Sequence, residues 1–426
     1  MRHFLTAAVV VLAVFFVCPG CKTDNASSAC GKIEFRKENA LTVRVEAAVT
    51  SLNPILPSAG YNRYAAADMF QTLAAVEPKT LELVPLLIKK IPAVYTVASG
   101  PHQGALAYDF EIYDEARWDD GSPVTANDVL FTLKLIYHPQ LPLGDWLGYF
   151  EYLKTVEIDP ANPKKFTVYF NQYYILALET LCQFPIYPAY VYDADQVLSK
   201  VPFADLQNPE RAKQVVAANP ALSAWAEAFQ SPKFANDKTV ITGSGAYRIE
   251  SFDVDQGLVL VKKQNWWGDQ LAKDNPYLVA APEKIIYRFV KDEAPVESLV
   301  RSGDLDVVPA LSPEKFLELK NDSCLYLRYD FQLVAANSYG RIMCNLRKPQ
   351  LAEKAVRQAL AHAVDYDYLI NTIWQGMAER CVSQVNPAKP FYARNLKPYP
   401  YNVQKARDLL AAAGWTDTNG NGIADK

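Results

Sequence analysis

The hydrophobic pattern begins with a continuous apolar run, Phe4–Val17, in which Thr6 is the only polar side chain. A run of this length is too short to cross about 30 Å of hydrocarbon as a stable helix. Arg2 and His3 precede it, and Gly20 supplies the small residue that a signal peptidase needs before its cut. Residues 1–20 are therefore predicted to be a signal peptide that is removed on export.

Cys21 follows this segment directly, where a cysteine indicates lipoprotein processing with diacylglycerol on its sulfur. Cys18 stands where the usual lipobox prefers leucine, so the alternative is a plain secreted protein cut near Cys21. Residues 21–39 begin with small and polar side chains, as expected of a tether. The chain is thus predicted to lie in the periplasm or at the cell surface, held to the membrane by lipid at Cys21. Nothing later in the sequence resembles a membrane span.

Apolar and polar residues then alternate with a period of two in several short segments, which predicts strands. In the first of them, LTVRVEA, the apolar positions are Leu41, Val43 and Val45. Further strands are expected at 108–112, 166–170, 247–252 and 258–262. Residues 51–64 are rich in proline and asparagine and predict a loop, and residues 65–73 predict a short helix.

Helix boundaries are indicated by capping residues. Thr125 is an expected N-cap with Asp128 as its capping-box partner, before a helix that stops ahead of Pro139. A strand at 285–290, a helix at 296–300 ended by Gly303, and a strand at 305–308 predict a right-handed βαβ unit in a partly parallel sheet. The end of the sequence predicts three helices, over 355–363, 365–373 and 402–413.

Length and composition narrow the class of protein. The chain has 426 residues, which exceeds one ordinary hydrophobic core, so two or three domains are expected. Half of the residues are apolar and 21% are charged, as in globular proteins. The net charge of −4 argues against nucleic acid as a partner. The 25 tyrosines suit a concave ligand site, although most are expected to be core residues.

The cysteines do not form a metal-binding pattern. Cys18 leaves with the signal peptide and Cys21 would carry lipid, which leaves an odd set of five: Cys30, Cys182, Cys324, Cys344 and Cys381. Cys324 and Cys344 lie on two strand-like runs and are the pair to test for a disulfide. Unpaired, buried thiols are the favoured alternative.

Motifs for catalysis, metals or cofactors are not found. His102, His138 and His362 have no HExxH spacing and no neighbouring cysteine cluster. Gly243-Ser244-Gly245 lacks the spacing of a nucleophile elbow. Asp417 begins half of a calcium-loop pattern, for which a polar turn is the better interpretation. The chain is therefore not expected to be an enzyme or to hold a cofactor.

Six segments, in order, resemble one known family, the bacterial extracellular solute-binding proteins of the oligopeptide and dipeptide type (family 5). They cover most of residues 40–426. The segments are 120–129 (DGSPVTANDV), 243–247 (GSGAY), 266–268 (WWG), 296–308 (VESLVRSGDLDVV), 356–365 (VRQALAHAVD) and 406–423 (ARDLLAAAGWTDTNGNGI).

This resemblance implies an α/β, bilobal fold of the periplasmic-binding-protein type with an extra inserted domain. Lobe I would comprise residues 40–65 and 165–311, the inserted domain residues 66–164, and lobe II residues 312–426. The final helix, over 402–413, has nothing after it to complete a layer, so lobe II is expected to be incomplete and the chain truncated at its C-terminus.

The resemblance also implies that a peptide binds between the two lobes, through hydrogen bonds to its backbone. The carboxylate that would bind the peptide's amino terminus is expected beyond residue 426. Candidate contacts are the segment after the first strand and the tyrosines of the following loop, both in lobe I, and two more distant side chains. These residues are Glu46, Ala47, Val49, Thr50, Tyr61, Tyr64, Tyr247 and Arg341.

The function implied is a monomeric solute-binding lipoprotein that delivers peptides to the permease subunits of an ABC importer. One alternative keeps the fold and changes the ligand to a nickel chelate, haem, an opine or an oligosaccharide. Another is a surface sensor lipoprotein without a transport role. A secreted hydrolase is the least favoured, because no catalytic constellation is present.

Overall fold

The structure is a computed structural model, and it describes residue 30 and residues 38–56, 65–254, 256–334 and 339–426. The predicted signal peptide, the lipid site Cys21 and the loop residues Tyr61 and Tyr64 lie outside the described residues. Within them, no helix is both long and apolar enough to cross a membrane.

The chain alternates strands and helices, so the predicted α/β class is confirmed. The strands are β1 (Ala40–Val45), β2 (Ala74–Val76), β3 (Leu83–Pro85), β4 (Tyr95–Thr96), β5 (Leu106–Glu111), β6 (Leu153–Ile158), β7 (Lys165–Phe170), β8 (Tyr247–Asp253), β9 (Gly257–Lys262) and β10 (Lys284–Phe289). The helices before β8 are α3 (Ala126–Ile136), α4 (Gly144–Leu147), α5 (Ala177–Gln183), α6 (Ala189–Tyr192), α7 (Phe203–Gln207), α8 (Pro209–Ala218), α9 (Pro220–Phe229) and α10 (Pro232–Asn236). After β9 come η1 (Trp267–Gln270), η2 (Pro276–Leu278), α11 (Val296–Ser302), α12 (Pro313–Lys320), α13 (Ser323–Tyr326), α14 (Pro349–Ala352), α15 (Lys354–Ala363), α16 (Tyr366–Tyr368), η3 (Leu369–Ile373) and α17 (Val403–Ala412).

The first sheet has the order β1-β10-β9-β8. β1 runs parallel to β10, from the pair Ala40 and Lys284 to the pair Val45 and Phe289, and the other two pairings are antiparallel. On its other side, β1 meets the predicted strand at 305–308 through a parallel bridge between Val43 and Val307. The partly parallel sheet predicted for the βαβ unit is therefore confirmed, and β1 has partners on both sides.

The second four-stranded sheet has the order β4-β5-β7-β6 and is antiparallel throughout. The helix α3 follows β5, and its predicted capping residues are confirmed because the Asp128 carboxylate accepts a hydrogen bond from the Thr125 amide at 2.8 Å. The predicted domain boundary between residues 164 and 165 falls between β6 and β7 of this one sheet. The domain boundaries themselves stay a prediction.

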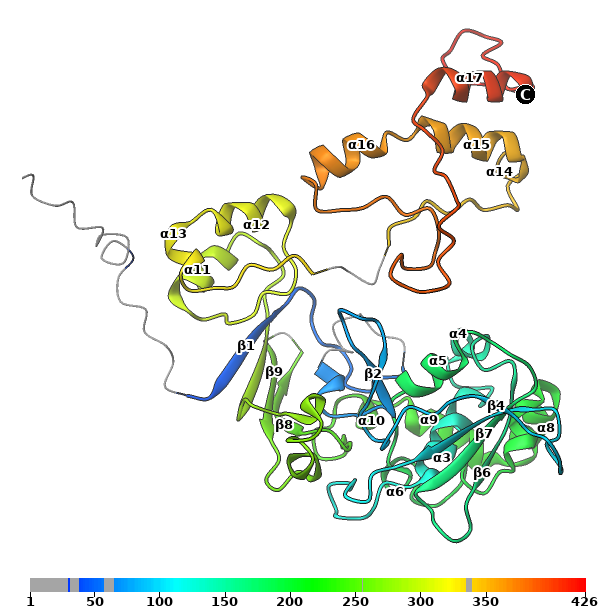
Figure 1. Cartoon of the computed structure of the whole chain (residues 1–426), viewed down its shortest axis with the longest axis vertical. Helices are drawn as coiled ribbons and strands as arrows, with labels where there is room; N and C mark the ends of the chain where they lie inside the picture. Colours follow the sequence, from blue (N-terminus) through cyan, green and yellow to red (C-terminus); the bar gives the residue numbers. More distant parts are fainter. Residues whose placement is uncertain (1–29, 31–37, 57–64, 255, 335–338) are drawn as a thin grey trace, which may run out of the picture.

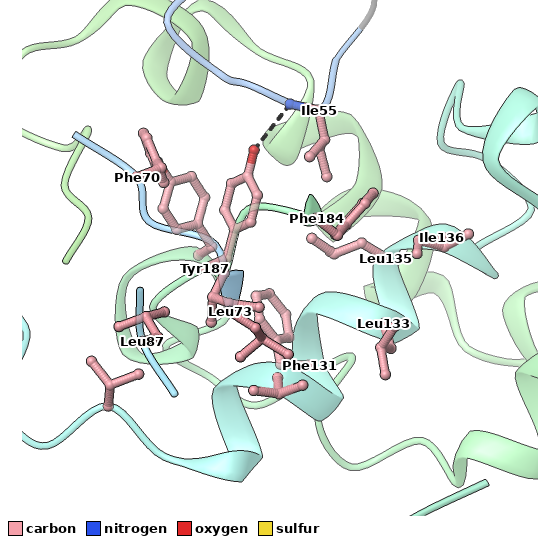
Figure 2. Close-up of a cluster of buried hydrophobic side chains, with 14 of the residues drawn as sticks. Ile55, Phe70, Leu73, Leu87, Phe131, Leu133, Leu135, Ile136, Phe184 and Tyr187 are labelled. Atoms are coloured by element: carbon pink, nitrogen blue, oxygen red, sulfur yellow. Dashed lines mark hydrogen bonds between the residues drawn. The ribbon is translucent and has the colours of Figure 1, made fainter. Parts of the chain in front are cut away.

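One continuous core of buried side chains extends from the β1 sheet to the β5 sheet and the helices around it. Tyr187 lies at its centre and is fully buried, with Phe70 and Phe131 among its neighbours in the cluster (Figure 2). The Tyr187 hydroxyl accepts a hydrogen bond from the Ile55 amide and donates one to Asn53, at 3.2 and 2.6 Å. This phenol therefore fixes the loop after β1 to the core of the second sheet.

Residues 243–247 (GSGAY), one of the segments that resemble the family, pack against the backbone of residues 68 and 69. A Cβ on Gly245 would lie 2.4 Å from the Asp68 carbonyl oxygen, and one on Gly243 would lie 2.3 Å from that of Met69. Both indole N–H groups of the Trp266-Trp267 motif donate to the Ser244 carbonyl oxygen, each at 2.9 Å. The Gly243–Tyr247 segment, the Trp266-Trp267 motif and residues 68–69 thus form one close-packed contact, which we call the glycine joint.

A smaller cluster of buried side chains joins α11, α12 and α13, and includes Val296, Val300, Leu319 and Leu325. The predicted start of lobe II at residue 312 falls within this cluster and stays a prediction. Gly303 ends α11 in the left-handed conformation, as its position predicts.

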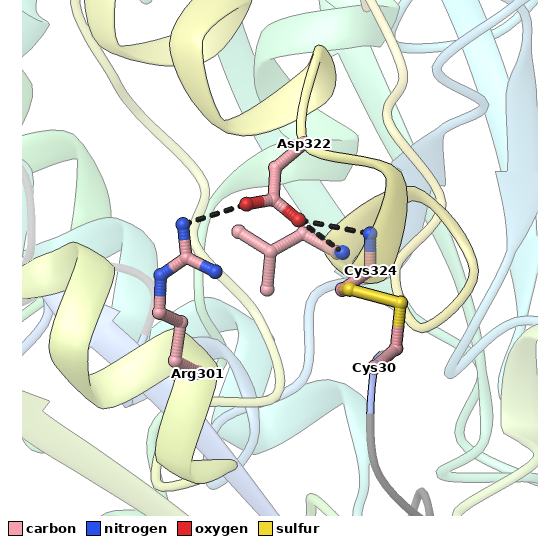
Figure 3. The surroundings of a disulfide bond; sticks show 5 residues. Cys30, Arg301, Asp322 and Cys324 are labelled. Carbon is pink, nitrogen blue, oxygen red and sulfur yellow. Dashed lines mark hydrogen bonds and ion pairs between the residues drawn. A yellow bond between two sulfur atoms is a disulfide. The ribbon is translucent and has the colours of Figure 1, made fainter. Parts of the chain in front are cut away.

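The disulfide in the described structure joins Cys30 to Cys324 (Figure 3). The pairing of Cys324 with Cys344 was therefore a wrong prediction. Cys324 lies on the helix α13 rather than on a strand, and Cys344 is a free thiol. The alternative of unpaired, buried thiols is correct for Cys182 alone. Cys344 and Cys381 are also free, but Cys344 is half-buried and Cys381 is exposed.

Residues 339–426 contain α14–α17 and appear in Figure 1 as a body of their own, which we call the C-terminal body. Asp365 and Asn402 cap its helices as predicted, accepting hydrogen bonds from the amides of Tyr368 and Lys405. The predicted helix over 65–73 is wrong beyond residue 67. Residues 68–70 form a turn, and Gln71 and Thr72 then pair with the backbone around Pro185.

The close packing at the glycine joint makes the stability of the protein sensitive to one added methyl group. Gly245→Ala places its Cβ against carbonyl and backbone atoms that cannot rotate away, so we expect a loss of about 1–3 kcal/mol of unfolding free energy. Gly144→Ala is the matched control, because a Cβ there meets open space. Denaturant unfolding of both variants measures the difference, and equal stability of the two would contradict the close approach at Gly245.

A second prediction concerns pH. His138 is buried beside Trp225, and this burial lowers the pKa of its imidazole to about 4. The unfolded chain takes up a proton on this residue below about pH 6.5, whereas the folded chain does so only near pH 4. The contribution of His138 to stability is thus present above pH 6.5 and falls by about 3 kcal/mol between pH 6.5 and 4.

Urea unfolding of the wild type and His138→Gln from pH 7 to pH 4 tests this expectation. The variant should lose less stability on acidification than the wild type, and the difference isolates His138 from other titrating groups. Parallel pH profiles for the two proteins would show that the imidazole ionises freely in the folded state.

Candidate functional site

The candidate site lies at the carboxyl edge of the parallel strands. Because β1, β10 and residues 305–308 run in the same direction, their carboxyl ends meet at one edge of the sheet. The chain leaves this edge at Glu46, at Lys291 and at Pro309. In open α/β sheets, ligands bind in the crevice outside the carboxyl ends of the strands.

Arg44 holds the three chain segments together at this edge. Its side chain is 1% exposed, and its guanidinium donates hydrogen bonds to the carbonyl oxygens of Val290, Lys291 and Ala310 at 3.1, 3.2 and 2.7 Å. It also donates to the Glu46 carboxylate at 3.2 Å. Because the guanidinium is buried, loss of any of these acceptors would leave part of its charge without a hydrogen-bond partner and would destabilise the fold.

Backbone bonds reinforce the same edge. The Arg44 amide donates to the Val307 carbonyl oxygen at 2.9 Å, and the amides of Asp306 and Val307 donate to the Thr42 carbonyl oxygen. The Asp306 carboxylate accepts from the Thr42 amide at 2.7 Å. The edge is therefore a rigid platform, from which the segment after β1 projects.

That segment, residues 46–50, turns away from the sheet. Among the residues that the structure describes, the backbone amides and carbonyls of Ala47, Ala48 and Val49 have no hydrogen-bond partner. Val49 is buried and Ala47 is half-buried. Leu52 and Asn53 then return the chain to the core, through the Ala235 carbonyl oxygen and the Tyr187 hydroxyl. A short stretch of unpaired backbone is thus held between two fixed ends.

The structure brings only part of the predicted set of ligand-binding residues to this edge. Glu46, Ala47, Val49 and Thr50 lie there, and Thr50 is exposed. Tyr247 is buried in the β1 sheet, where its hydroxyl donates to the Pro282 carbonyl oxygen at 2.8 Å. Burial also raises the pKa of Tyr247 to about 12.

Arg341 belongs to the C-terminal body, where its guanidinium donates to the Tyr339 hydroxyl at 3.0 Å. The roles of these residues in ligand binding stay predictions.

The C-terminal body contacts the rest of the protein through Lys389. Its ammonium donates to the Glu179 carboxylate of α5 at 2.8 Å and to the Leu81 carbonyl oxygen at 3.1 Å. The Lys389 side chain is 12% exposed, so this ion pair is partly shielded from water. This contact holds Lys389 of the C-terminal body against Glu179 and Leu81, in the part of the protein that carries the β5 sheet.

Other parts of the described surface offer no stronger site. A hollow of about 470 Å³ lies on the β5 sheet and is lined by charged side chains, including Asp109, Glu157 and Lys165. It is not at the carboxyl edge of β1. No cluster of metal-binding side chains occurs among the residues that the structure describes.

Sequence reasoning missed Arg44. The alternating pattern of β1 predicts Thr42 and Arg44 on a solvent-facing side, yet both are buried. A strand with parallel partners on both sides is covered on both faces, so alternation fails for it. The predicted βαβ unit could have indicated this burial, because it places two parallel strands in one sheet, and strands of parallel sheets are covered on both faces.

Comparisons with known proteins find relatives of this chain. The model of the family "Bacterial extracellular solute-binding proteins, family 5 Middle" matches residues 82–425. The chain is 25% identical to the oligopeptide-binding protein AppA of Bacillus subtilis (strain 168) over 432 residues, 99% of this chain and 68% of that protein. It is 28% identical to the nickel-binding periplasmic protein of Escherichia coli (strain K12) over 188 residues, 43% of this chain and 33% of that protein.

The structure of AppA from Bacillus subtilis in complex with a nonapeptide is similar in fold, with a TM-score of 0.63 at 21% identity. The match covers 91% of this chain and 66% of that structure. The chain therefore spans about two thirds of the length of this relative.

The platform at the carboxyl edge predicts a strong dependence on the guanidinium of Arg44. Arg44→Lys keeps the charge but cannot reach all the carbonyl oxygens, so we expect a loss of about 2–4 kcal/mol of unfolding free energy. Arg248→Lys, at an exposed position of β8, is the control. Hydrogen exchange should also become faster at residues 290–291 and 306–310, and unchanged exchange there would contradict the role of Arg44.

Proposed function

The chain belongs to the bacterial extracellular solute-binding proteins of family 5, and from this membership we propose that it captures a peptide outside the cytoplasm and delivers it to the permease of an ABC importer. The resemblance stated from the sequence motifs is confirmed by the family match over residues 82–425. Members of such a family bind solutes rather than convert them, so the proposed role is transport and not catalysis.

The proposal includes export and a lipid anchor. Residues 1–20 have the pattern of a signal peptide, and Cys21 is the proposed site of lipid attachment. The disulfide between Cys30 and Cys324 supports an extracytoplasmic location, because disulfides persist in oxidising compartments. The mature protein would act as a monomer at the outer side of a membrane.

The observation that carries the ligand class is the unpaired backbone at Ala47, Ala48 and Val49. A peptide offers N–H and C=O groups at regular spacing, and an extended protein segment can pair with them whatever the peptide's side chains are. The rigid ends of this segment, at Arg44 and Asn53, keep its groups in position before the ligand arrives. Such preorganisation reduces the entropy lost on binding. Glu46 and Thr50 flank it and would contact the ligand.

The C-terminal body would supply the second wall of the site. The contact of Lys389 with Glu179 and Leu81 brings this body against the part of the protein that carries the β5 sheet. Closing two bodies over a ligand excludes water and strengthens the hydrogen bonds to its backbone. Arg341 is the proposed contact from this side.

A nickel chelate is the second candidate, favoured by the similarity to the nickel-binding periplasmic protein of Escherichia coli. Imidazole groups are the expected ligands for nickel. Of the histidines in the described structure, His138 and His362 are buried, and His102 is paired with Glu157 at 2.7 Å. The peptide is therefore the preferred ligand.

Thermal unfolding of the exported protein with peptides of two to nine residues, nickel with histidine, haem and oligosaccharides tests the proposal. A peptide at a hundredfold excess over its Kd should raise the unfolding free energy by about 2.7 kcal/mol. Stabilisation by nickel with histidine alone would replace the peptide by the second candidate. No stabilisation by any peptide would contradict the proposed function.

A matched pair of variants tests the role of the backbone. Ala47→Pro removes one amide N–H from the unpaired segment, whereas Ala47→Gly keeps it. We expect Ala47→Pro to weaken peptide binding about tenfold, the effect of one hydrogen bond, while Ala47→Gly binds nearly as the wild type does. Calorimetric titration with the peptide found above measures both, and equal weakening of the two variants would contradict backbone recognition at this position.

A further inference from the structure

The disulfide between Cys30 and Cys324 has a geometric consequence for a lipid-anchored protein. Cys30 lies nine positions after Cys21 in the sequence. A covalent chain of this length spans at most about 30 Å, even when fully extended. If the chain were held only from Asn39 on, whose carbonyl oxygen accepts from the Glu283 amide, the connection from Cys21 would be twice as long. The reach from Cys21 would then be about 60 Å.

The part of the surface that the disulfide ties down is a corner made of residues 323–328, which we call the α13 corner. Tyr326 is 61% exposed and Leu327 is 56% exposed, and both lie within three positions of Cys324. Tyrosine and leucine side chains are well suited to the boundary between headgroups and hydrocarbon, where the phenol keeps its hydroxyl in water.

The α13 corner is rigid, so these two side chains cannot turn inward. The Asp322 carboxylate accepts hydrogen bonds from the amides of Cys324 and Leu325 at 2.8 and 3.1 Å, and it pairs with Arg301 of α11 at 2.7 Å (Figure 3). Leu325 occupies the inward position and is buried in the cluster with α11. The Tyr326 ring lies parallel to that of Phe331, with 6.5 Å between the ring centroids, and remains largely exposed.

We propose that the α13 corner rests on the lipid surface, with Tyr326 and Leu327 at the membrane interface and the Cys30–Cys324 disulfide keeping this corner next to the anchor. The inference rests on the lipid anchor of the proposed function. The occupant is lipid because this corner is joined to Cys21, through Cys324 and Cys30, by a connection of at most about 30 Å. The contact would fix the orientation in which the protein is presented at the membrane.

The experiment uses the processed full-length lipoprotein in phosphatidylcholine vesicles whose acyl chains carry bromine, which quenches nearby tryptophan fluorescence. Tyr326→Trp adds a probe at the α13 corner. Tyr190→Trp adds one at an exposed position of α6, on the part of the protein that carries the β5 sheet (Figure 1). We expect loss of most of the added emission for Tyr326→Trp and no loss for Tyr190→Trp, each compared with the unchanged protein.

Two further variants test the tether. A double change of Cys30→Ser and Cys324→Ser removes the disulfide, and an insertion of ten glycine and serine residues after Asn25 lengthens the tether without touching the folded part. Both should restore much of the quenched emission of the Tyr326→Trp probe. Quenching that is unaffected by either change would overturn the role of the short tether.

Sedimentation with vesicles separates failure of this inference from failure of the anchor. If the wild type sediments and Cys21→Ser does not, the lipid anchor stands. Equal quenching of the two probes would then overturn the α13 corner as the contact. If the wild type does not sediment, the anchor itself fails, and the inference fails with it.

Discussion

The buried guanidinium of Arg44 is the interaction on which the candidate site depends. It lies between three segments that are far apart in sequence, and its hydrogen bonds to Val290, Lys291 and Ala310 fix where β1, β10 and the strand-like residues 305–308 end. A charge that is 1% exposed is costly to bury unless every acceptor is in place. The arrangement therefore couples the fold of the β1 sheet to the geometry of the edge from which residues 46–50 project.

A second constraint acts from the other end of that segment. The Tyr187 hydroxyl accepts a hydrogen bond from the Ile55 amide (Figure 2). It also donates one to Asn53, so the segment after β1 is fixed to the core beside α3. The glycine joint at Gly243 and Gly245 brings the backbone of residues 68 and 69 against the β1 sheet in the same manner. Together these contacts make the two sheets one packed unit, and they leave Ala47–Val49 as a stretch of unpaired backbone within it.

The sequence predicted those features that depend on local chemistry. Capping by Thr125 and Asp128 and the left-handed Gly303 are local, and the structure contains both. The partly parallel sheet expected of the βαβ unit is also present, although β1 lies between the two strands of that unit. The burial of Arg44, the contact of Lys389 with Glu179 and the Cys30–Cys324 disulfide depend on segments between 210 and 294 residues apart, for which periodicity carries no signal. The wrong pairing of Cys324 with Cys344 came from taking a helix for a strand.

Amide hydrogen exchange tests most directly the proposed recognition of a peptide by the unpaired backbone of residues 47–49. Exchange of the exported protein is measured by mass spectrometry with and without a peptide that raises its melting temperature. We expect peptide binding to slow exchange of the amides of Ala47, Ala48 and Val49 more than exchange of the already bonded amides of β1. A bound peptide that leaves exchange at these three positions unchanged would contradict it.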